Sequence, residues 1–204
     1  MYEIKKLNYN ETEMEPYIDS KTFRIQKNLQ KEYLDKLNQI LIKNKYDFRY
    51  EINDLVNHLN VFMLEDRGDI LFNLGGYLNH TNYLNNISPY KKNVLNGKIK
   101  DAIINKYGTF SNFKNIFINE GLKLVGNGYL YLVLDSNLDL NIITLSNEEI
   151  PYTYGFTPLI TLDLWEHAYF LKYNLNKKRY IEDFFNIIDF VEVNNLYIEK
   201  TKKQ

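Results

Sequence analysis

The sequence predicts an α+β fold, in which an N-terminal helical hairpin domain precedes an α/β domain with a three-stranded antiparallel sheet. Three features of the chain support this prediction. A four-residue apolar repeat fills residues 21–42, as in a long amphipathic helix. Strand-forming residues follow Gly126 and Gly128, whereas Ser88-Pro89 interrupts the pattern between a helical first half and a mixed second half. The predicted domains are therefore residues 1–88 and 89–204.

Helices account for most of the expected elements. The apolar repeat of the first helix consists of Ile25, Leu29, Tyr33, Leu37 and Leu41. Further helices are expected at residues 53–63 and 69–84, and, after the interruption at Ser88-Pro89, at residues 95–106 and 111–122. Helices are also expected to fill the C-terminal part of the chain up to residue 197.

The three predicted strands lie in the second half. Residues 129–134 are rich in strand formers, and the turn cluster Asp135-Ser136-Asn137 follows them directly. Residues 138–145 then return as the second strand of a hairpin. Residues 159–163 supply a third short strand.

Charge and composition exclude several classes of protein. The chain has 25 basic and 26 acidic residues, and this balance does not indicate binding to nucleic acid or to a membrane surface. With no Cys, it can form neither a disulfide nor a thiolate metal ligand. No apolar run approaches the ~20 residues of a membrane span. Because the N-terminus lacks a signal or transit pattern, we expect an intracellular, cytoplasmic protein.

The segment Asp163-Leu164-Trp165-Glu166-His167 is the strongest candidate for chemistry. It places a carboxylate and one of only three His residues four positions apart. Such a pair lies on one face of a helix and can converge on a metal ion. The alternative is a helix start that Asp163 caps, with His167 pointing inward. The spacing alone leaves both interpretations open.

Several longer segments occur in an order that resembles a known family. They are Glu15-Pro16-Tyr17-Ile18-Asp19, Tyr33-Leu34-Asp35-Lys36-Leu37-Asn38, Gly75-Gly76-Tyr77-Leu78-Asn79-His80, residues 107–114, residues 126–132 and residues 163–173. Together they resemble the iron/manganese superoxide dismutases over nearly the whole chain. That family has the same arrangement of a helical hairpin followed by an α/β domain.

The resemblance implies a site for one Mn or Fe ion. In the family three His and one Asp hold the metal, and the matching positions here are His80, Asp163 and His167. The first His is missing: counting from the N-terminal anchor places Gln26 there, and counting back from the end of the first helix places Ile25 there. Either Gln26 contributes a weak amide-oxygen ligand, or water completes a two-His-one-carboxylate set, or the site stays empty.

The resemblance also assigns roles around the metal. Tyr33 matches the active-site Tyr, and Trp165 matches a wall of the pocket. Glu148 replaces a Gln that hydrogen-bonds the metal-bound solvent in manganese-type members. An ionised carboxylate cannot donate that bond, so Glu148 either favours the higher oxidation state, binds the metal, or turns toward solvent. Glu166 matches the residue that pairs with the partner subunit's ligand His, which implies a homodimer.

Two functions remain open at this point. The first is superoxide dismutase activity of the iron/manganese type, which converts superoxide to oxygen and hydrogen peroxide at a mononuclear metal. The second is a catalytically impaired or inactive family member that serves as a structural or interaction subunit, for example of a mitochondrial ribosome. Retention of Tyr33, His80 and Asp163 favours the enzyme, whereas loss of the first His and of the Gln at position 148 favours the scaffold.

Overall fold

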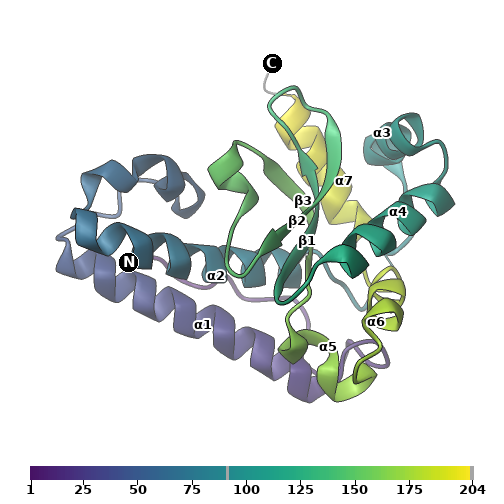
Figure 1. The fold of residues 1–204 in the computed structure, drawn as a ribbon, viewed down its shortest axis with the longest axis horizontal. Coiled ribbons are helices and arrows are strands. Elements are labelled where there is room, and N and C mark those ends of the chain that lie inside the picture. The colour runs from purple at the N-terminus through teal and green to yellow at the C-terminus, as the bar shows by residue number, and fades with distance from the viewer. Residues whose placement is uncertain (91, 203–204) are drawn as a thin grey trace.

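The computed structural model describes residues 1–90 and 92–202, which form a helical arm beside an α/β body (Figure 1). In the arm, α1 (Ser20–Lys43) packs along α2 (Arg67–Asn85), and the 3-10 segments η1 (Ile52–Val61) and η2 (Leu64–Asp66) connect them. The body contains α3 (Gly97–Tyr107), α4 (Phe110–Lys123), β1 (Gly128–Leu134), β2 (Leu140–Ser146), η3 (Pro151–Tyr154), β3 (Thr157–Asp163), α5 (Glu166–Tyr173), α6 (Lys177–Phe184) and α7 (Phe190–Thr201). The predicted α+β class is confirmed.

Helix α1 begins at a capped N-terminus and buries a different face from the one predicted for its first turns. The Asp19 carboxylate accepts hydrogen bonds from the backbone N–H groups of Lys21 and Thr22, which satisfies two free donors of the first turn. Further along, Leu37 and Leu41 are buried against the arm, as expected. Near the start, however, Gln26 and Gln30 are buried. The predicted apolar positions 25 and 29 lie beside this face and are only partly buried.

The segment between α1 and α2 differs from the helix predicted at residues 53–63. It is a 3-10 segment whose helical backbone breaks at His58, which has φ −125°. Asn and Asp favour local side-chain hydrogen bonds over a regular helix, and four of them lie between residues 53 and 60. His58 therefore does not lie in a regular helix, as the prediction for residues 53–63 implied. Its ring packs edge-on against Tyr50, with 3.7 Å between the centroids.

The sheet confirms the predicted three antiparallel strands, in the order β2-β1-β3. All seven residues of the central strand β1 are buried, and successive side chains point to opposite faces. Leu130 and Leu132 join the main hydrophobic core with α4, α6 and α7. Tyr129 and Tyr131 point the other way, where their hydroxyl groups contact residues of α2. The register pairs Tyr129 with Asp163, the last residue of β3.

The two halves share a core. Met14, Phe23 and Tyr83 from the first half belong to the same apolar cluster as the sheet and the C-terminal helices. Asn86, buried at the end of α2, donates a hydrogen bond to the Leu159 carbonyl (3.0 Å) and accepts one from the Thr161 backbone N–H (2.7 Å). Because packing crosses residue 88, the division into residues 1–88 and 89–204 stays a prediction.

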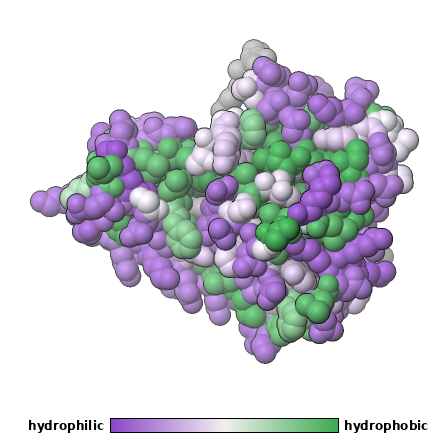
Figure 2. Space-filling view, in the orientation of Figure 1, coloured by the Kyte–Doolittle hydropathy of each residue, from purple (hydrophilic) through white to green (hydrophobic). Residues whose placement is uncertain are grey.

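On the surface, hydrophilic side chains predominate along α1, whereas apolar side chains gather over the half that contains the sheet (Figure 2). Among the described helices, none combines the length and apolar character that a membrane crossing would require.

Candidate metal centre

Three side chains from three elements converge where the arm meets the body. They are His80 from α2, Asp163 from the end of β3 and His167 from the first turn of α5, and their ligand atoms all lie within 4.8 Å of one another. Asp163 Oδ2 lies 3.0 Å from His167 Nε2 and 4.0 Å from His80 Nε2. Within residues 1–90 and 92–202 this is the one group of three or more potential ligand residues that meets this distance. Two imidazoles and a carboxylate form a donor set that suits divalent first-row metals.

Asp163 and His167 come together through a different backbone geometry from the predicted one. Asp163 ends a strand and α5 begins only at Glu166, so the pair does not share a helix face. The chain turns at residues 164–165, and Asp163 Oδ1 accepts a hydrogen bond from the Trp165 backbone N–H (2.8 Å). This turn brings His167 back over the carboxylate.

The Asp163 carboxylate is completely buried and is held by several donors. Gln26 Nε2 donates to Oδ2 at 2.7 Å, in addition to the contact with His167. Burial alone would raise the pKa of Asp163, but the nearby His167 and His80 and the hydrogen bonds lower the pKa below its usual value. Asp163 is therefore ionised at neutral pH, as a metal ligand must be.

His80 presents a free nitrogen to the same point. Its Nδ1 lies 2.7 Å from the Gly76 carbonyl oxygen, which fixes the proton on Nδ1 and leaves Nε2 as the lone-pair nitrogen. That Nε2 is buried and has no hydrogen-bond partner among the residues that the structure describes. Burial lowers the pKa of His80, so the ring is neutral. A buried lone pair without a donor is costly, and a metal ion would satisfy it.

His167 closes the site from the more exposed side, with 24% of its side chain accessible. Burial opposes protonation, but Asp163 raises the pKa of His167 above the usual value by charge attraction and by a hydrogen bond. The Trp165 ring stacks on the His167 ring, with centroids 5.8 Å apart and planes 26° apart. Trp165 thus lies against a candidate ligand ring, and its role as a pocket wall stays a prediction.

Gln26, not Ile25, faces the site. Gln26 is fully buried, whereas Ile25 is only partly buried on the neighbouring face of α1. The atom that faces Asp163 is the amide nitrogen, which does not bind metals. The amide oxygen Oε1 is buried and makes no hydrogen bond to any described residue. Gln26 therefore acts here as a hydrogen-bond donor to a ligand, and only its oxygen could serve as a ligand itself.

Glu148 points into the protein, so the alternative that it turns toward solvent is wrong. Glu148 is 4% exposed, and its two carboxylate oxygens accept hydrogen bonds from the Tyr33 hydroxyl (3.0 Å) and the Tyr129 hydroxyl (3.3 Å). Burial raises the pKa of Glu148 to about 7, although these two hydrogen bonds oppose the shift. Glu148 is not a member of the converging ligand group. It lies beside the site as a group that exchanges a proton near neutral pH.

Tyr129 is a further participant, to which the sequence analysis assigned no role. Its hydroxyl oxygen lies 3.4 Å from His80 Nδ1 and donates to Glu148, so it connects a ligand ring to the buried carboxylate. Burial raises the pKa of Tyr129 well above the usual value, which keeps the hydroxyl protonated. The position of Tyr129 beside the site follows from the β1–β3 register, because Tyr129 is the cross-strand partner of Asp163. A local motif search cannot detect such a pair.

Two adjacent glycines in α2 allow these parts to approach. A Cβ atom built on Gly75 would lie 2.0 Å from the backbone carbonyl oxygen of Glu148. One built on Gly76 would lie 2.5 Å from the Tyr33 ring. Real Cβ contacts are not this short, so only glycine lets α2 pack so closely against α1 and against the loop of Glu148.

Comparison with known proteins agrees with this geometry. Residues 1–88 match the family model of the iron/manganese superoxide dismutase alpha-hairpin domain, and residues 95–196 match that of the C-terminal domain. The chain belongs to the iron/manganese superoxide dismutase family.

Similar proteins carry corresponding names. "Superoxide dismutase [Mn]" of Listeria monocytogenes is 32% identical over 197 residues, covering 96% of this chain and 97% of the relative. "Superoxide dismutase [Mn/Fe] 2" of Staphylococcus aureus shows the same identity and coverage. "Superoxide dismutase [Mn] 2" of Bacillus anthracis is 28% identical over 204 residues, covering 100% of this chain and 98% of the relative.

The close approach at Gly75 can be tested by mutation. Gly75→Ala should destabilise the protein by about 1–3 kcal/mol, because the new methyl group overlaps the Glu148 carbonyl oxygen and the loop must move. Gly68→Ala is the matched control in the same helix, since a Cβ there meets no atom within 4 Å. It should be neutral or stabilise by up to ~1 kcal/mol. Urea denaturation measures both values, and equal effects of the two variants would contradict the packing argument.

Proposed function

We propose that this chain binds one Mn or Fe ion through His80, Asp163 and His167 and acts as a superoxide dismutase. The observation that supports the proposal most directly is the buried, unpartnered Nε2 of His80 beside the ionised Asp163. The set contains two neutral-nitrogen donors and one negative oxygen donor, which fits a first-row divalent ion. The relatives' names point to the same metals.

Residues around the proposed metal site hold its ligand side chains in position. When bound, a manganese or iron ion supplies one-electron chemistry, alternating between two oxidation states as superoxide is first oxidised and then reduced. Asp163 holds its ligand oxygen in place through Gln26 and the Trp165 N–H. The Gly76 carbonyl orients His80. These contacts fix the donors before the metal arrives, so little reorganisation is needed.

Protons for peroxide formation come from the hydroxyl–carboxyl chain. The Tyr33 hydroxyl donates to Glu148 Oε1 and is the half-buried end of the chain. Glu148 holds or releases a proton near pH 7, and Tyr129 connects it to the ligand side. This hydrogen-bonded relay of Tyr33, Glu148 and Tyr129 delivers protons to the reduced substrate without opening the site to bulk water.

A homodimer is part of the proposal. Glu166 is exposed on the first turn of α5, and Phe170, one turn later on the same face, is 45% exposed. Since His167 uses Nε2 toward Asp163, its Nδ1 lies on the more exposed side of the ring. A carboxylate of a second subunit could accept a hydrogen bond from it. An exposed Phe beside such a pair is typical of an interface.

The ligand assignment predicts unequal effects of substitution. His80→Ala, Asp163→Ala and His167→Ala should each abolish stoichiometric Mn or Fe, because two donors do not retain the ion. Gln26→Ala removes only a hydrogen bond to Asp163 and should weaken metal affinity by about 10–100-fold. Metal analysis of the purified protein beside a superoxide-scavenging assay measures both. Equal loss in all four variants would make Gln26 a full ligand, and an unmutated chain that takes up no metal would favour the scaffold function.

Restoring an imidazole at position 26 tests the geometry of the fourth ligand. Gln26→His should raise metal affinity and the dismutation rate, since residue 26 is the buried position of α1 beside Asp163. Ile25→His is the control, because one residue along a helix turns the side chain by about 100° away from the metal. A gain with Ile25→His and none with Gln26→His would contradict this placement.

The proposed interface can be tested in solution. Sedimentation velocity at micromolar concentration should show a dimer, and Phe170→Asp should shift it toward monomer by placing a charge in the apolar contact. Val94→Asp is the control, since Val94 is an exposed apolar residue (68%) outside α5. A monomer in the unmutated chain, or dissociation by both variants alike, would refute an interface built on α5.

A further inference from the structure

A buried tyrosine of the central strand contacts the residue that precedes His80 in the chain. Tyr131 is fully buried in β1 and points to the same face of the sheet as Tyr129. Its hydroxyl donates to Asn79 Oδ1 at 2.8 Å, and the Glu149 carbonyl oxygen is a more distant acceptor at 3.2 Å. Asn79 lies in α2 and is also completely buried. Neither Tyr131 nor Asn79 belongs to the converging ligand group.

The Asn79 amide connects α2 to the loop that carries Glu148. Its Nδ2 donates to the Glu149 carbonyl oxygen at 3.2 Å. Burial raises the pKa of Glu148, and a hydrogen bond from Asn79 is among the contacts that oppose this rise. Both loop contacts need the N–H groups of the amide, because the amide oxygen can only accept. The oxygen must therefore face the other way, toward Tyr131.

The Tyr131 hydroxyl satisfies this oxygen. Among the described residues it is the one donor to Asn79 Oδ1. Burial raises the pKa of Tyr131 well above the usual value, so the hydroxyl keeps its proton and remains a donor. A buried amide oxygen without a donor is unfavourable. Without Tyr131 the amide would be free to rotate and present Oδ1 to Glu148, which favours the protonated carboxyl over the ionised one.

We propose that Tyr131 is a positioning residue for Glu148. Through its hydrogen bond to Asn79, it holds the amide nitrogen toward the carboxylate and so favours release of the Glu148 proton. The benefit to catalysis rests on the proposed function, because Glu148 is part of the proposed proton relay. The orientation of the amide, in contrast, is a property of the chain without metal.

The other titratable groups that act on Glu148 come from four different elements. They are Tyr33 of α1, Tyr129 of β1, Asp163 of β3 and His167 of α5. Across the described part of the chain, no hydrogen bond joins any of these four side chains to Tyr131 or to Asn79. Removal of the Tyr131 hydroxyl consequently reaches Glu148 through Asn79.

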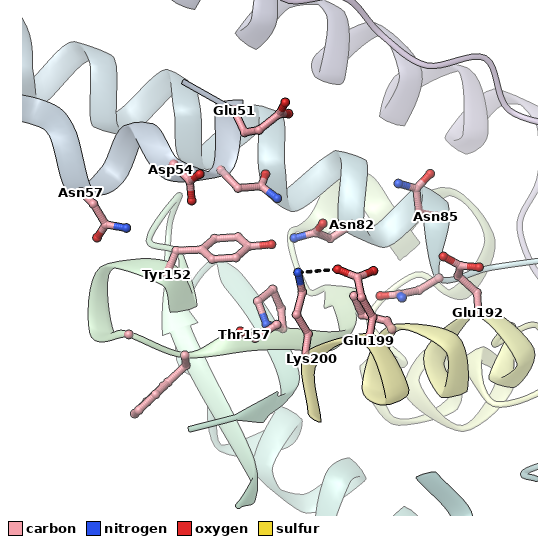
Figure 3. Close-up of a pocket in the computed structure, with 16 residues that line it drawn as sticks. Glu51, Asp54, Asn57, Asn82, Asn85, Tyr152, Thr157, Glu192, Glu199 and Lys200 are labelled. Atoms are coloured by element: carbon pink, nitrogen blue, oxygen red, sulfur yellow. Dashed lines mark hydrogen bonds and ion pairs between the residues drawn. The ribbon is translucent and has the colours of Figure 1, made fainter. Parts of the chain in front are cut away.

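Tyr152 offers a matched control. Its hydroxyl is hydrogen-bonded with Asn82, about one turn after Asn79 on α2. Figure 3 shows this hydroxyl directed toward Asn82 at a cavity between η1, α2 and α7, and Glu148 is not among the residues that line the cavity. Tyr152→Phe therefore removes a hydroxyl that pairs with an asparagine of the same helix, but leaves the contacts of Glu148 intact.

Carboxyl 13C NMR of the metal-free, full-length chain tests the proposal, with Glu148→Gln to assign the signal. Tyr131→Phe should raise the pH midpoint of Glu148 by roughly one unit, because a hydrogen bond to the ionised form is lost. Tyr152→Phe should leave the midpoint unchanged. Asn79→Ala removes the amide itself and should raise the midpoint as Tyr131→Phe does. Adding Tyr131→Phe to Asn79→Ala should then have no further effect.

Three outcomes would overturn the proposal. The first is an unchanged midpoint in both Tyr131→Phe and Asn79→Ala. The second is an equal rise in Tyr152→Phe, which would indicate a general response to losing a buried hydroxyl. The third is a further rise in the double variant, since Tyr131 would then act by another route. All of these titrations use metal-free protein, whereas failure of the proposed function would appear as missing metal or missing dismutase activity in the unmutated chain.

Discussion

The buried negative charge of Asp163 is the constraint on which the rest of the centre depends. A carboxylate without solvent access is unfavourable unless donors surround it. Those donors come from three directions: Gln26 on α1, the Trp165 N–H in the turn after β3, and His167 on α5. Each element must therefore dock before the charge is compensated. This requirement explains why an amide is acceptable at position 26: it donates to Asp163, which an apolar side chain cannot do.

A second carboxylate beside the first would ordinarily be destabilising. Glu148 is tolerated because Tyr33 and Tyr129 both donate to it, and because its raised pKa lets it shed its charge near neutrality. Relative to the pattern that the family implies, an imidazole has become an amide at position 26 and an amide has become a carboxylate at position 148. The first change contacts Asp163, whereas the second contacts Tyr33 and Tyr129, and these tyrosines compensate it.

Sequence alone predicted the long periodic elements and the three residues that converge at the candidate metal centre, because both are encoded in local segments. It misjudged the segment around His58, where Asn-rich sequence gives a 3-10 backbone. The choice between Ile25 and Gln26 could not be made, since the two anchors differ by one residue and only packing fixes the helix rotation. The inward orientation of Glu148 and the role of Tyr129 depend on loop packing and on cross-strand register, which no single segment records.

The separation of the ligands along the chain also has a consequence for biosynthesis. Gln26 and His80 leave the ribosome long before Asp163 and His167, since synthesis proceeds from the N-terminus. Moreover, the core that supports the sheet includes Phe190 and Val193 of α7. The nascent N-terminal half consequently has no assembled site with which to capture a metal. For the proposed metal site, selection of the ion is thereby deferred until the chain is nearly complete, when the ions available in the surroundings, and not those present during translation, determine the outcome.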